Sequence, residues 1–470
     1  MSSPTPSPPT SILIVGAGVF GLSTSLSLLL SPRYSSSHIT ILDTHAPLPF
    51  PTPSESHNPH AASIDNSRII RADYSNPLYT ALAQKAQQIW RDKYAKQGIY
   101  HESGLAIVGE EAKSGWEYIE NARANVGSKI RSHDDESIQG LGSPEEIKTA
   151  LKTGGSSGSA GYINHGSGWA DAAAAMADVQ RQVDEEAKKQ GRRIWRREKA
   201  VELLYAKAQH SAHTPGTERK QRKIAGVRLE SGETLQADLV ILAAGAWTGA
   251  LIDLRGRAEA TAQVLAYISL TPGERSQLQS MPVILNLGTG LFAIPPSPAA
   301  NSLFKIARHG YGYRNPISIT DPTSGESRTV SLPPSHFSPI PAEGSIALRE
   351  FLKDLVPWLA ERPFTHTRMC WYTDTPKGDF IVDFHPEIEG LFLATGGSGH
   401  AFKFLPVMGE KVVEALEGRL DSELRALWAW PEAVHGFSGT EDGSRGGRQG
   451  MLLWEEWERG EGSKERESRL

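Results

Sequence analysis

Near its start the chain reads Ile12-Leu-Ile-Val-Gly-Ala-Gly-Val-Phe-Gly21, and the architecture can be inferred outward from these residues. Residues 12 to 15 are apolar and mostly β-branched, which predicts a buried strand. Gly16, Gly18 and Gly21 have the spacing G-x-G-x-x-G, and an apolar run of helical length continues to Leu30. The sequence therefore predicts a strand, a tight turn and a helix.

This unit has the features of a dinucleotide-binding site. Gly16 permits the turn, Gly18 lets backbone N–H groups approach a pyrophosphate, and Gly21 lets the helix pack closely on the strand. The helix N-terminus then faces the phosphate anion. A second strand over 39–42 ends at Asp43, 22 residues after Gly21, where a carboxylate accepts hydrogen bonds from ribose hydroxyls. The motif alone does not separate FAD from NAD.

Length and composition bound the class of protein. With 470 residues the chain is longer than a single core usually holds, so we expect two domains or one domain with a large insertion. It is 39% apolar and 22% charged with a net charge of −5, which indicates neither a nucleic-acid nor a membrane partner. The apolar run after residue 11 lacks a preceding basic region, which argues against a signal anchor. Cys370 is the single cysteine, so an intrachain disulfide is excluded.

A second buried strand over 240–244, followed by Gly245, suggests that one nucleotide-binding sheet is assembled from distant segments. Alternating strands between 256 and 365 suit an antiparallel second domain. The predicted fold class is therefore α/β plus antiparallel β: a Rossmann-like nucleotide-binding domain with an inserted antiparallel substrate-binding domain. The first domain is expected to comprise residues 11–75, 160–255 and 366–420, and the second 76–159 and 256–365. Three further segments are expected to lack regular structure: a disordered leader at 1–10, a Pro/Ser-rich loop at 314–342, and a polar tail at 431–470.

A second glycine-rich turn, Thr395-Gly-Gly-Ser-Gly-His-Ala-Phe-Lys-Phe404, repeats the logic of the first. A strand over 391–395 precedes it and a helix through 410–416 follows it. The N–H groups of Gly397, Ser398 and Gly399 and the positive end of the helix would favour negative charge, such as that on a reduced flavin. Two such turns imply a ligand with two anionic regions, and FAD fits this better than NAD.

Three more stretches carry residues with chemical potential: Asn66-Ser-Arg-Ile-Ile-Arg71, Lys305-Ile-Ala-Arg-His-Gly-Tyr-Gly-Tyr313 and Met369-Cys-Trp-Tyr-Thr-Asp-Thr-Pro376. Together with both glycine turns they resemble the flavin amine oxidases of the sarcosine oxidase group, in the D-amino-acid-oxidase-like superfamily. Among these the chain looks most similar to fungal saccharopine oxidases and fructosyl amino acid oxidases. The resemblance spans about residues 11 to 417.

The resemblance implies roles for particular residues. Cys370 would join FAD covalently through its sulfur, and Lys305 would lie over the flavin face and stabilise superoxide as oxygen takes up electrons. Arg68, with Ser67 before it, would lie beside the flavin ring. Arg71 and Lys403 would hold the substrate carboxylate. On a helix the two arginines would share a face, whereas on a strand they would point apart.

Some assignments stay open at this level. His400 is a candidate cofactor contact, although it equally suits packing at the flavin edge or capping of the loop. Tyr311, Tyr313 and His309 are candidate pocket residues, and we predict no metal site. The chain has Ser63-Ile64 where sarcosine oxidases have histidines, which disfavours sarcosine and allows a bulkier secondary amine.

The implied function is an FAD-dependent oxidase that acts on the C–N bond of a secondary amino acid with oxygen and releases hydrogen peroxide. Saccharopine-like and fructosyl amino acids are the leading substrates. The alternatives are an N-methyl amino acid oxidase, a flavin dehydrogenase with another electron acceptor, and a flavin-binding protein without catalysis. We expect a monomer whose partners are the amino acid and oxygen.

The final residues Ser468-Arg-Leu470 are close to the peroxisomal address Ser-Lys-Leu. They predict a peroxisomal location and recognition by the import receptor. An enzyme that makes hydrogen peroxide is sensibly placed beside catalase, so the two expectations support each other.

Overall fold

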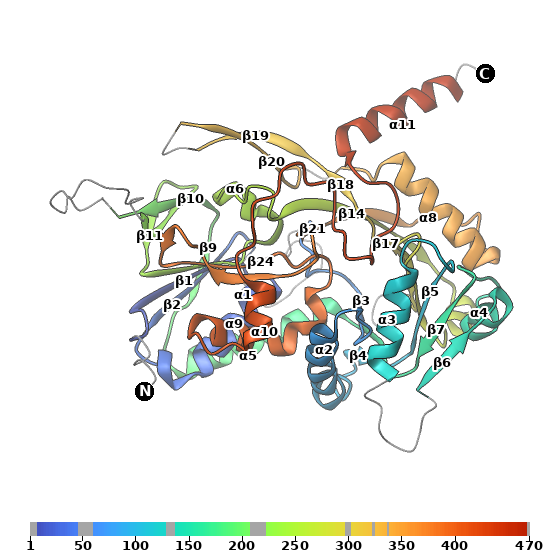
Figure 1. Cartoon of the computed structure of the whole chain (residues 1–470), viewed down its shortest axis with the longest axis horizontal. Helices are drawn as coiled ribbons and strands as arrows, with labels where there is room; N and C mark the ends of the chain where they lie inside the picture. Colours follow the sequence, from blue (N-terminus) through green and yellow to red (C-terminus); the bar gives the residue numbers. More distant parts are fainter. Residues whose placement is uncertain are drawn as a thin grey trace.

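Six strands form the sheet that contains the N-terminal fingerprint (Figure 1). In spatial order they are β22 (Ile381–Phe384), β24 (Leu391–Thr395), β13 (Leu239–Leu242), β1 (Ser11–Val15), β2 (His38–Asp43) and β9 (Trp195–Arg197). All pairs are parallel except β22 with β24. Residue 12 pairs with residue 239, so the prediction that distant segments share one sheet is confirmed. The computed structural model describes residues 7–45, 60–127, 137–206, 222–296, 302–321, 325–335 and 338–467.

The two faces of this sheet are covered differently because side chains alternate along each strand. Ile12 and Ile14 pack in the core shared with helices α1 (Val19–Leu30), α5 (Ala172–Lys189) and α9 (Leu405–Leu416). Leu13 and Val15 face the opposite way and pack in a core shared with a small sheet. That sheet consists of β10 (Ala200–Tyr205), β11 (Arg222–Leu229), β12 (Thr234–Gln236) and β23 (Ile388–Glu389), which pairs with β11 (Figure 1). The layered arrangement leaves the carboxyl ends of the parallel strands to bear the glycine turns.

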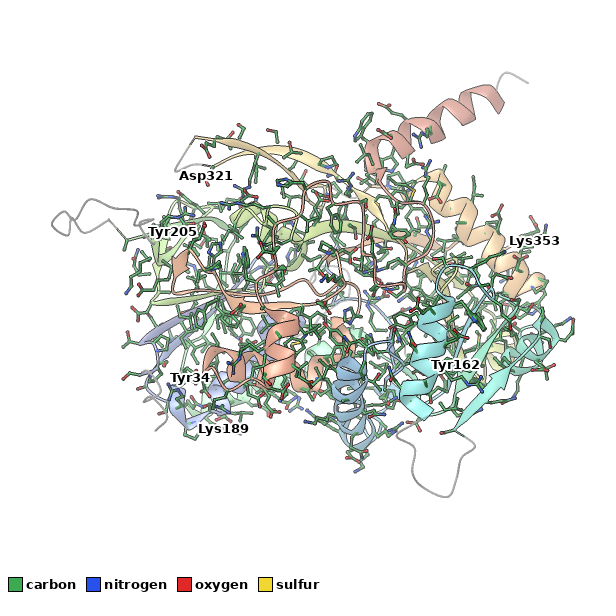
Figure 2. The ribbon with its side chains drawn as sticks, viewed as in Figure 1. Tyr34, Tyr162, Lys189, Tyr205, Asp321 and Lys353 are labelled. Carbon is green, nitrogen blue, oxygen red and sulfur yellow. The ribbon has the colours of Figure 1, made fainter. Side chains whose placement is uncertain are left out.

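A larger, mainly antiparallel sheet forms the second part of the molecule. Its strands, in spatial order, are β25 (Met451–Leu452), β18 (Tyr313–Arg314), β14 (Glu259–Ser269), β17 (Leu303–Arg308), β16 (Leu291–Ile294), β15 (Val283–Asn286), β5 (Leu105–Gly109), β7 (Ala160–Asn164) and β6 (Ile138–Leu141), and β21 (His366–Asp374) also pairs with β14. Helix α8 (Ala342–Leu355) packs against it in the second core. Tyr34 and Tyr162, both buried, mark the two parts of the molecule in Figure 2. The predicted combination of an α/β part with antiparallel β structure is therefore confirmed.

Shorter elements lie between the two sheets. Strand β3 (Arg68–Ile70) pairs with β8 (Gly168–Ala170), which also pairs with β4 (Tyr100–His101). Helix α2 (Pro77–Ile89) runs into a turn of π-helix over Trp90–Tyr94, and Gly98, with φ of +70°, follows it. Arg68 begins strand β3 and Arg71 directly follows it, and the two side chains have different partners: Cys370 for Arg68 and Tyr118 for Arg71.

Two strands that were expected in the nucleotide-binding domain pair in the antiparallel sheet instead. Strand β7 pairs with β5 and β6, and β21 pairs with β14 over nine positions. The sequence shows that these segments are strands, but it does not show which sheet supplies their hydrogen-bonding neighbours. The division into domains as a whole stays a prediction.

Two segments that were expected to lack regular structure contain some in the residues that the structure describes. The region 314–342 contains a hairpin of β19 (Pro316–Thr320) and β20 (Ser327–Ser331), whose mostly polar side chains hide its strand pattern. The tail has no helix or strand over 431–450, as expected, but then forms helix α11 (Leu453–Glu467), which projects from the body (Figure 1). Residues 1–6 of the expected leader and 468–470 of the expected targeting signal lie outside the described residues. None of the helices in the described ranges is both long and apolar enough to cross a membrane.

Candidate active site

The first glycine turn has the close contacts that its spacing predicts. Gly16 has φ of +107°, and a Cβ there would lie 2.4 Å from the carbonyl oxygen of Ala243. A Cβ on Gly21 would lie 1.8 Å from the carbonyl oxygen of Gly16, so both positions exclude a side chain. At Gly18 the nearest atom to a Cβ would be the hydroxyl of Ser63, 3.9 Å away. The backbone is therefore open at the one glycine that should face a pyrophosphate.

Asp43 lies at the end of β2 against this turn. One carboxylate oxygen accepts from the backbone N–H of Ala17 at 2.7 Å, and the other accepts from that of His45 at 2.8 Å. The acid is thus held beside the turn by both its oxygens, which is the placement that ribose recognition requires.

The second glycine turn adjoins the first. It follows β24, and Ser398 has φ of +44° while its N–H donates to the carbonyl oxygen of Thr373 at 3.0 Å. A Cβ on Gly397 would lie 3.4 Å from the ring of Phe20 in α1, and one on Gly399 would lie 2.3 Å from the ring of Tyr372. Two backbone cradles side by side fit one extended, anionic cofactor such as FAD.

Three residues predicted from three separate stretches lie in one buried cluster. Arg68 donates to the sulfur of Cys370 at 3.4 Å. Lys305 of β17 donates to the carbonyl oxygen of Ser67 at 2.7 Å and to a carboxylate oxygen of Asp65 at 2.7 Å. Arg68 also pairs with Asp65. Sequence reasoning missed Asp65, which precedes the recognised arginines by a few residues and carries no spacing signal of its own.

The predicted carboxylate-binding residues form a second buried group. Arg71 donates to the hydroxyl of Tyr118 at 3.2 Å, and its guanidinium carbon lies 4.7 Å from the centre of the Tyr74 ring. The second terminal nitrogen of Arg71, Nη1, is buried and has no hydrogen-bond partner among the described residues. Lys403 donates to the hydroxyl of Tyr74 and to the carbonyl oxygen of His400, both at 3.0 Å. Burial lowers the pKa of Lys403 well below its usual value, and the charge of Arg71 adds to this.

His400 connects this group to the second glycine turn. Its Nε2 lies 2.8 Å from the carbonyl oxygen of Gly378, which can only accept, so Nε2 carries the hydrogen and Nδ1 accepts from the hydroxyl of Tyr74. Its ring stacks on Phe380 with centroids 4.6 Å apart. Burial and then Lys403 hold the pKa of His400 well below its usual value. His400 therefore acts as a neutral support for the Tyr74 hydroxyl and the loop.

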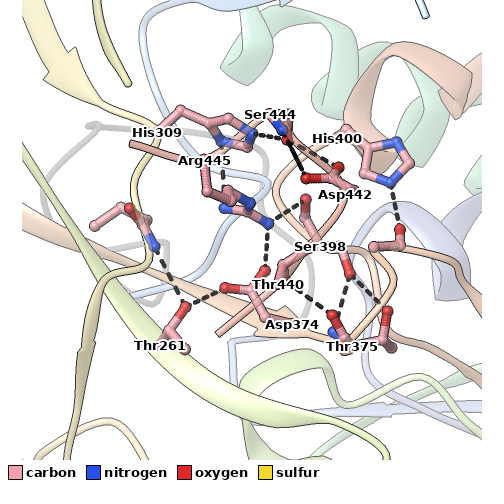
Figure 3. Close-up of polar contacts among 12 residues, drawn as sticks. Thr261, His309, Asp374, Thr375, Ser398, His400, Thr440, Asp442, Ser444 and Arg445 are labelled. Carbon is pink, nitrogen blue, oxygen red and sulfur yellow. Dashed lines mark hydrogen bonds and ion pairs between the residues drawn. The ribbon is translucent and has the colours of Figure 1, made fainter. Parts of the chain in front are cut away.

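Arg445, in the C-terminal tail, adds a third cation beside the group of Arg71 and Lys403 (Figure 3). Arg445 is fully buried and donates to Asp374 at 2.6 Å and to the carbonyl oxygen of Ser398 at 2.9 Å. Its guanidinium lies 5.5 Å from the centre of the Tyr372 ring. Burial lowers the pKa of His309 well below its usual value, and the charges of Arg445, Arg71 and Lys403 lower it further. Nη1 of Arg445 lies 3.4 Å from Nδ1 of His309. Arg445 was missed because the composition of the tail does not show its buried partner.

Two candidate pocket residues separate in the structure. His309 lies among the cations, with its ring 5.9 Å from that of Tyr372. Tyr313 faces the other side of the sheet, where its hydroxyl donates to Glu343 of α8. Within the described ranges there is no cluster of His, Cys, Asp or Glu able to hold a metal ion. The arrangement is therefore a cationic, partly aromatic region that suits a carboxylate ligand.

Comparisons with known proteins agree with this geometry. The amino acid oxidase imqH of Aspergillus flavus is 33% identical, over 90% of this chain and 98% of that protein. The L-saccharopine oxidase of Schizosaccharomyces pombe is 30% identical, over 90% of this chain and 93% of that protein. A solved structure of a modified fructosyl peptide oxidase from Aspergillus nidulans has a TM-score of 0.77 and 27% identity, covering 96% of this chain and 99% of that chain. Residues 11–415 match the family described as FAD dependent oxidoreductase, and the protein belongs to that family.

Proposed function

We propose that the protein is an oxidase that acts on the C–N bond of a secondary amino acid, with saccharopine-like and fructosyl amino acids as its leading substrates. The observation that carries the proposal is the buried pair of Arg71 and Lys403, in which Nη1 of Arg71 has no partner among the described residues. A guanidinium with an unused N–H group matches a carboxylate that binds through two oxygens. The similarity to an L-saccharopine oxidase and to fructosyl peptide oxidases supports the substrate class.

The roles of the residues follow from their positions. Arg71 and Lys403 would bind the substrate carboxylate and orient the amine, and their positive charges would favour the neutral amine over its protonated form. FAD, when bound, supplies the acceptor for the electrons of the C–H bond next to nitrogen. Lys305, buried beside Arg68 and Cys370, would hold positive charge where oxygen is reduced. The amine and oxygen then yield an imine and hydrogen peroxide, and water hydrolyses the imine to an amine and a carbonyl compound.

Oxygen uptake across a substrate panel tests this function. Saccharopine, fructosyl amino acids and N-methyl amino acids would each be offered to the flavin-loaded enzyme, with a catalase-sensitive assay for peroxide. We expect turnover of a bulky secondary amino acid and little turnover of sarcosine. No turnover of any panel member would contradict the substrate class, and reduction of a dye without peroxide would indicate a dehydrogenase.

We also propose that FAD is attached to the protein through Cys370. The thiol is buried, lies next to Arg68 and belongs to a strand that runs toward the second glycine turn. A permanent thioether would suit a site whose neighbouring Arg68 is held in place by Asp65.

Ser468-Arg-Leu470 supports a peroxisomal location through the import receptor, and we propose a monomer. A fluorescent fusion at the N-terminus would be imaged with and without these three residues, and enzymatic activity would be compared in extracts. We expect that removal disperses the signal without changing activity. Unchanged peroxisomal fluorescence after removal would contradict the proposal.

A further inference from the structure

Asp65 is the centre of the buried cluster that contains Lys305, although no sequence pattern points to it. Its side chain is completely inaccessible to solvent. One carboxylate oxygen accepts from Lys305 Nζ at 2.7 Å and from Arg68, and the other accepts from the hydroxyl of Tyr267 and from the N–H of Asn66 at 2.8 Å. The side-chain donors come from β3, β14 and β17, so this one carboxylate connects elements of two sheets.

The charges in this cluster do not cancel. Arg68, Lys305 and Arg368 are cations, and Asp65 is the carboxylate that faces all three. A buried charge without a partner costs several kcal/mol, so the position of Asp65 determines which cation is compensated. Lys305 Nζ has three hydrogens, and its acceptors among the described residues are Asp65 and the carbonyl oxygen of Ser67. One ammonium hydrogen therefore remains for a ligand.

We propose that Asp65 is a positioning residue for the reaction with oxygen: its carboxylate fixes the ammonium group of Lys305 and keeps the proton on it. The inference rests on the proposed function of Lys305. A residue that only filled space would leave the charge of Lys305 unchanged when replaced by a group of the same shape.

The electrostatics of the site support this role. Burial lowers the pKa of Lys305 to about 8, Asp65 raises it, and Arg68 and Arg368 lower it. The ring of Phe292, 5.8 Å from Nζ, carries no charge. Burial raises the pKa of Asp65, but Arg68, Lys305 and Arg368 outweigh burial and hold it below its usual range, so Asp65 is ionised at neutral pH. Without this carboxylate, Lys305 would face like charges alone.

The test uses Asp65→Asn in the flavin-loaded enzyme, because asparagine keeps the shape and removes the charge. Two rates are measured separately: anaerobic reduction by substrate and reoxidation by oxygen. An opposite charge at this distance favours the charged form by about 10- to 1,000-fold. We therefore expect reoxidation at neutral pH to slow at least about 10-fold and to recover as the pH falls, with substrate reduction changed less than about 2-fold.

A double-mutant cycle shows whether Asp65 affects reoxidation through Lys305 or whether its replacement disturbs the site in general. Lys305→Met alone should slow reoxidation, and adding Asp65→Asn should then change that rate little, because the group that Asp65 positions is gone. Equal effects of Asp65→Asn in both backgrounds would overturn the inference. A normal reoxidation rate in Lys305→Met would instead overturn the proposed function of Lys305, and the two failures are thus distinguishable.

Stability gives a readout that does not depend on activity. In Asp65→Asn, protonated Lys305 is buried beside like charges, so raising the pH from about 6 to about 8 should remove its proton and shrink the loss of stability relative to the wild type. Asp374→Asn is the matched control, because Asp374 is equally buried but pairs with Arg445, which stays charged. The loss of stability caused by Asp374→Asn should not depend on pH in this range. A deficit of Asp65→Asn that is equally independent of pH would also contradict the inference.

Discussion

At the scale of single residues, Cys370 offers the most direct experiment. Its sulfur accepts a hydrogen bond from Arg68 and it is the only thiol in the chain, so no other cysteine can substitute for it. We expect Cys370→Ala to bind FAD without a covalent bond. After acid precipitation the yellow colour should move from the pellet to the supernatant, whereas wild-type protein should keep it in the pellet. Colour in the pellet of the variant would contradict attachment at this position.

A substitution of Arg71 that changes the geometry of the side chain tests whether this residue binds the substrate carboxylate. Arg71→Lys keeps the charge but loses the planar fork, so we expect KM to rise by about 10- to 100-fold, which corresponds to one or two charge-assisted hydrogen bonds. Steady-state kinetics on the best substrate of the panel measures this. Arg181→Lys, on the solvent-exposed side of α5, is the control and should leave KM unchanged. A KM of wild-type size in Arg71→Lys would show that the carboxylate binds elsewhere.

The predictions for single residues agree best with the structure where a steric contact or a backbone conformation requires a particular residue. Gly16 and Gly21 leave no room for a side chain, and the G-x-G-x-x-G spacing predicts this requirement directly. Asp65 and Arg445 have no such signature, because their importance arises from partners such as Lys305 and Asp374, which are distant in sequence. A charged residue looks the same in a sequence whether it faces water or a buried counterion.

At the scale of elements, the segment 437–452 is a strap that joins the two sheets. Arg445 donates to Asp374 of β21 and to the second glycine turn, and Met451 pairs with Tyr313 of the antiparallel sheet. Figure 3 shows Thr440 and Arg445 entering this region from the strap. Helical and strand periodicity could not predict it, since most of the segment forms neither.

We expect that breaking the buried pair within the strap destabilises the fold. Arg445→Met leaves Asp374 buried without its cation, which should lower the free energy of unfolding by about 3–5 kcal/mol. Lys199→Ala, which removes a solvent-exposed pair with Glu230, should cost at most about 1 kcal/mol. Thermal or denaturant unfolding of the flavin-loaded proteins measures both.

The double variant Arg445→Met/Asp374→Leu distinguishes the cost of an unpaired buried carboxylate from the other effects of removing Arg445. Removing both charges should restore part of the lost stability, because no uncompensated carboxylate remains. If Arg445→Met unfolds like the wild type, the strap does not hold the sheets together through this ion pair.

At the scale of the whole molecule, the sequence predicted the fold class but not the way the two parts join. Parallel strands around β1 and antiparallel strands such as β14 and β17 follow from apolar runs and alternation. The placement of β7 and β21 in the antiparallel sheet depends on hydrogen bonds to distant strands, for which local pattern carries no information. Arg68 and Lys305 of the candidate active site could each be recognised from their own stretch of sequence, whereas their common partner Asp65 could not.

The proposed roles imply that the two steps of turnover depend on pH in opposite directions, and this allows a final prediction. Oxidation of the substrate requires a neutral amine, so the anaerobic reduction rate should rise with pH through the ionisation of the bound amine. In the proposed role of Lys305, the reaction with oxygen depends on its protonated form, and burial lowers the pKa of Lys305 to about 8. Above that pH the folded protein loses the ammonium charge and the oxygen step should slow.

Together, these two dependences should give a bell-shaped pH profile of turnover at low oxygen concentration. The alkaline limb of this profile reports the loss of the proton from Lys305. Rapid-mixing measurements of each step across the pH range assign the limbs separately. Lys305→Met should abolish the alkaline limb of the oxygen step and leave the acidic limb of substrate oxidation in place. An oxygen step that stays constant in wild-type enzyme as the pH rises through 8 would mean that another group supplies the charge, and the cluster around Asp65 would then have a structural role alone.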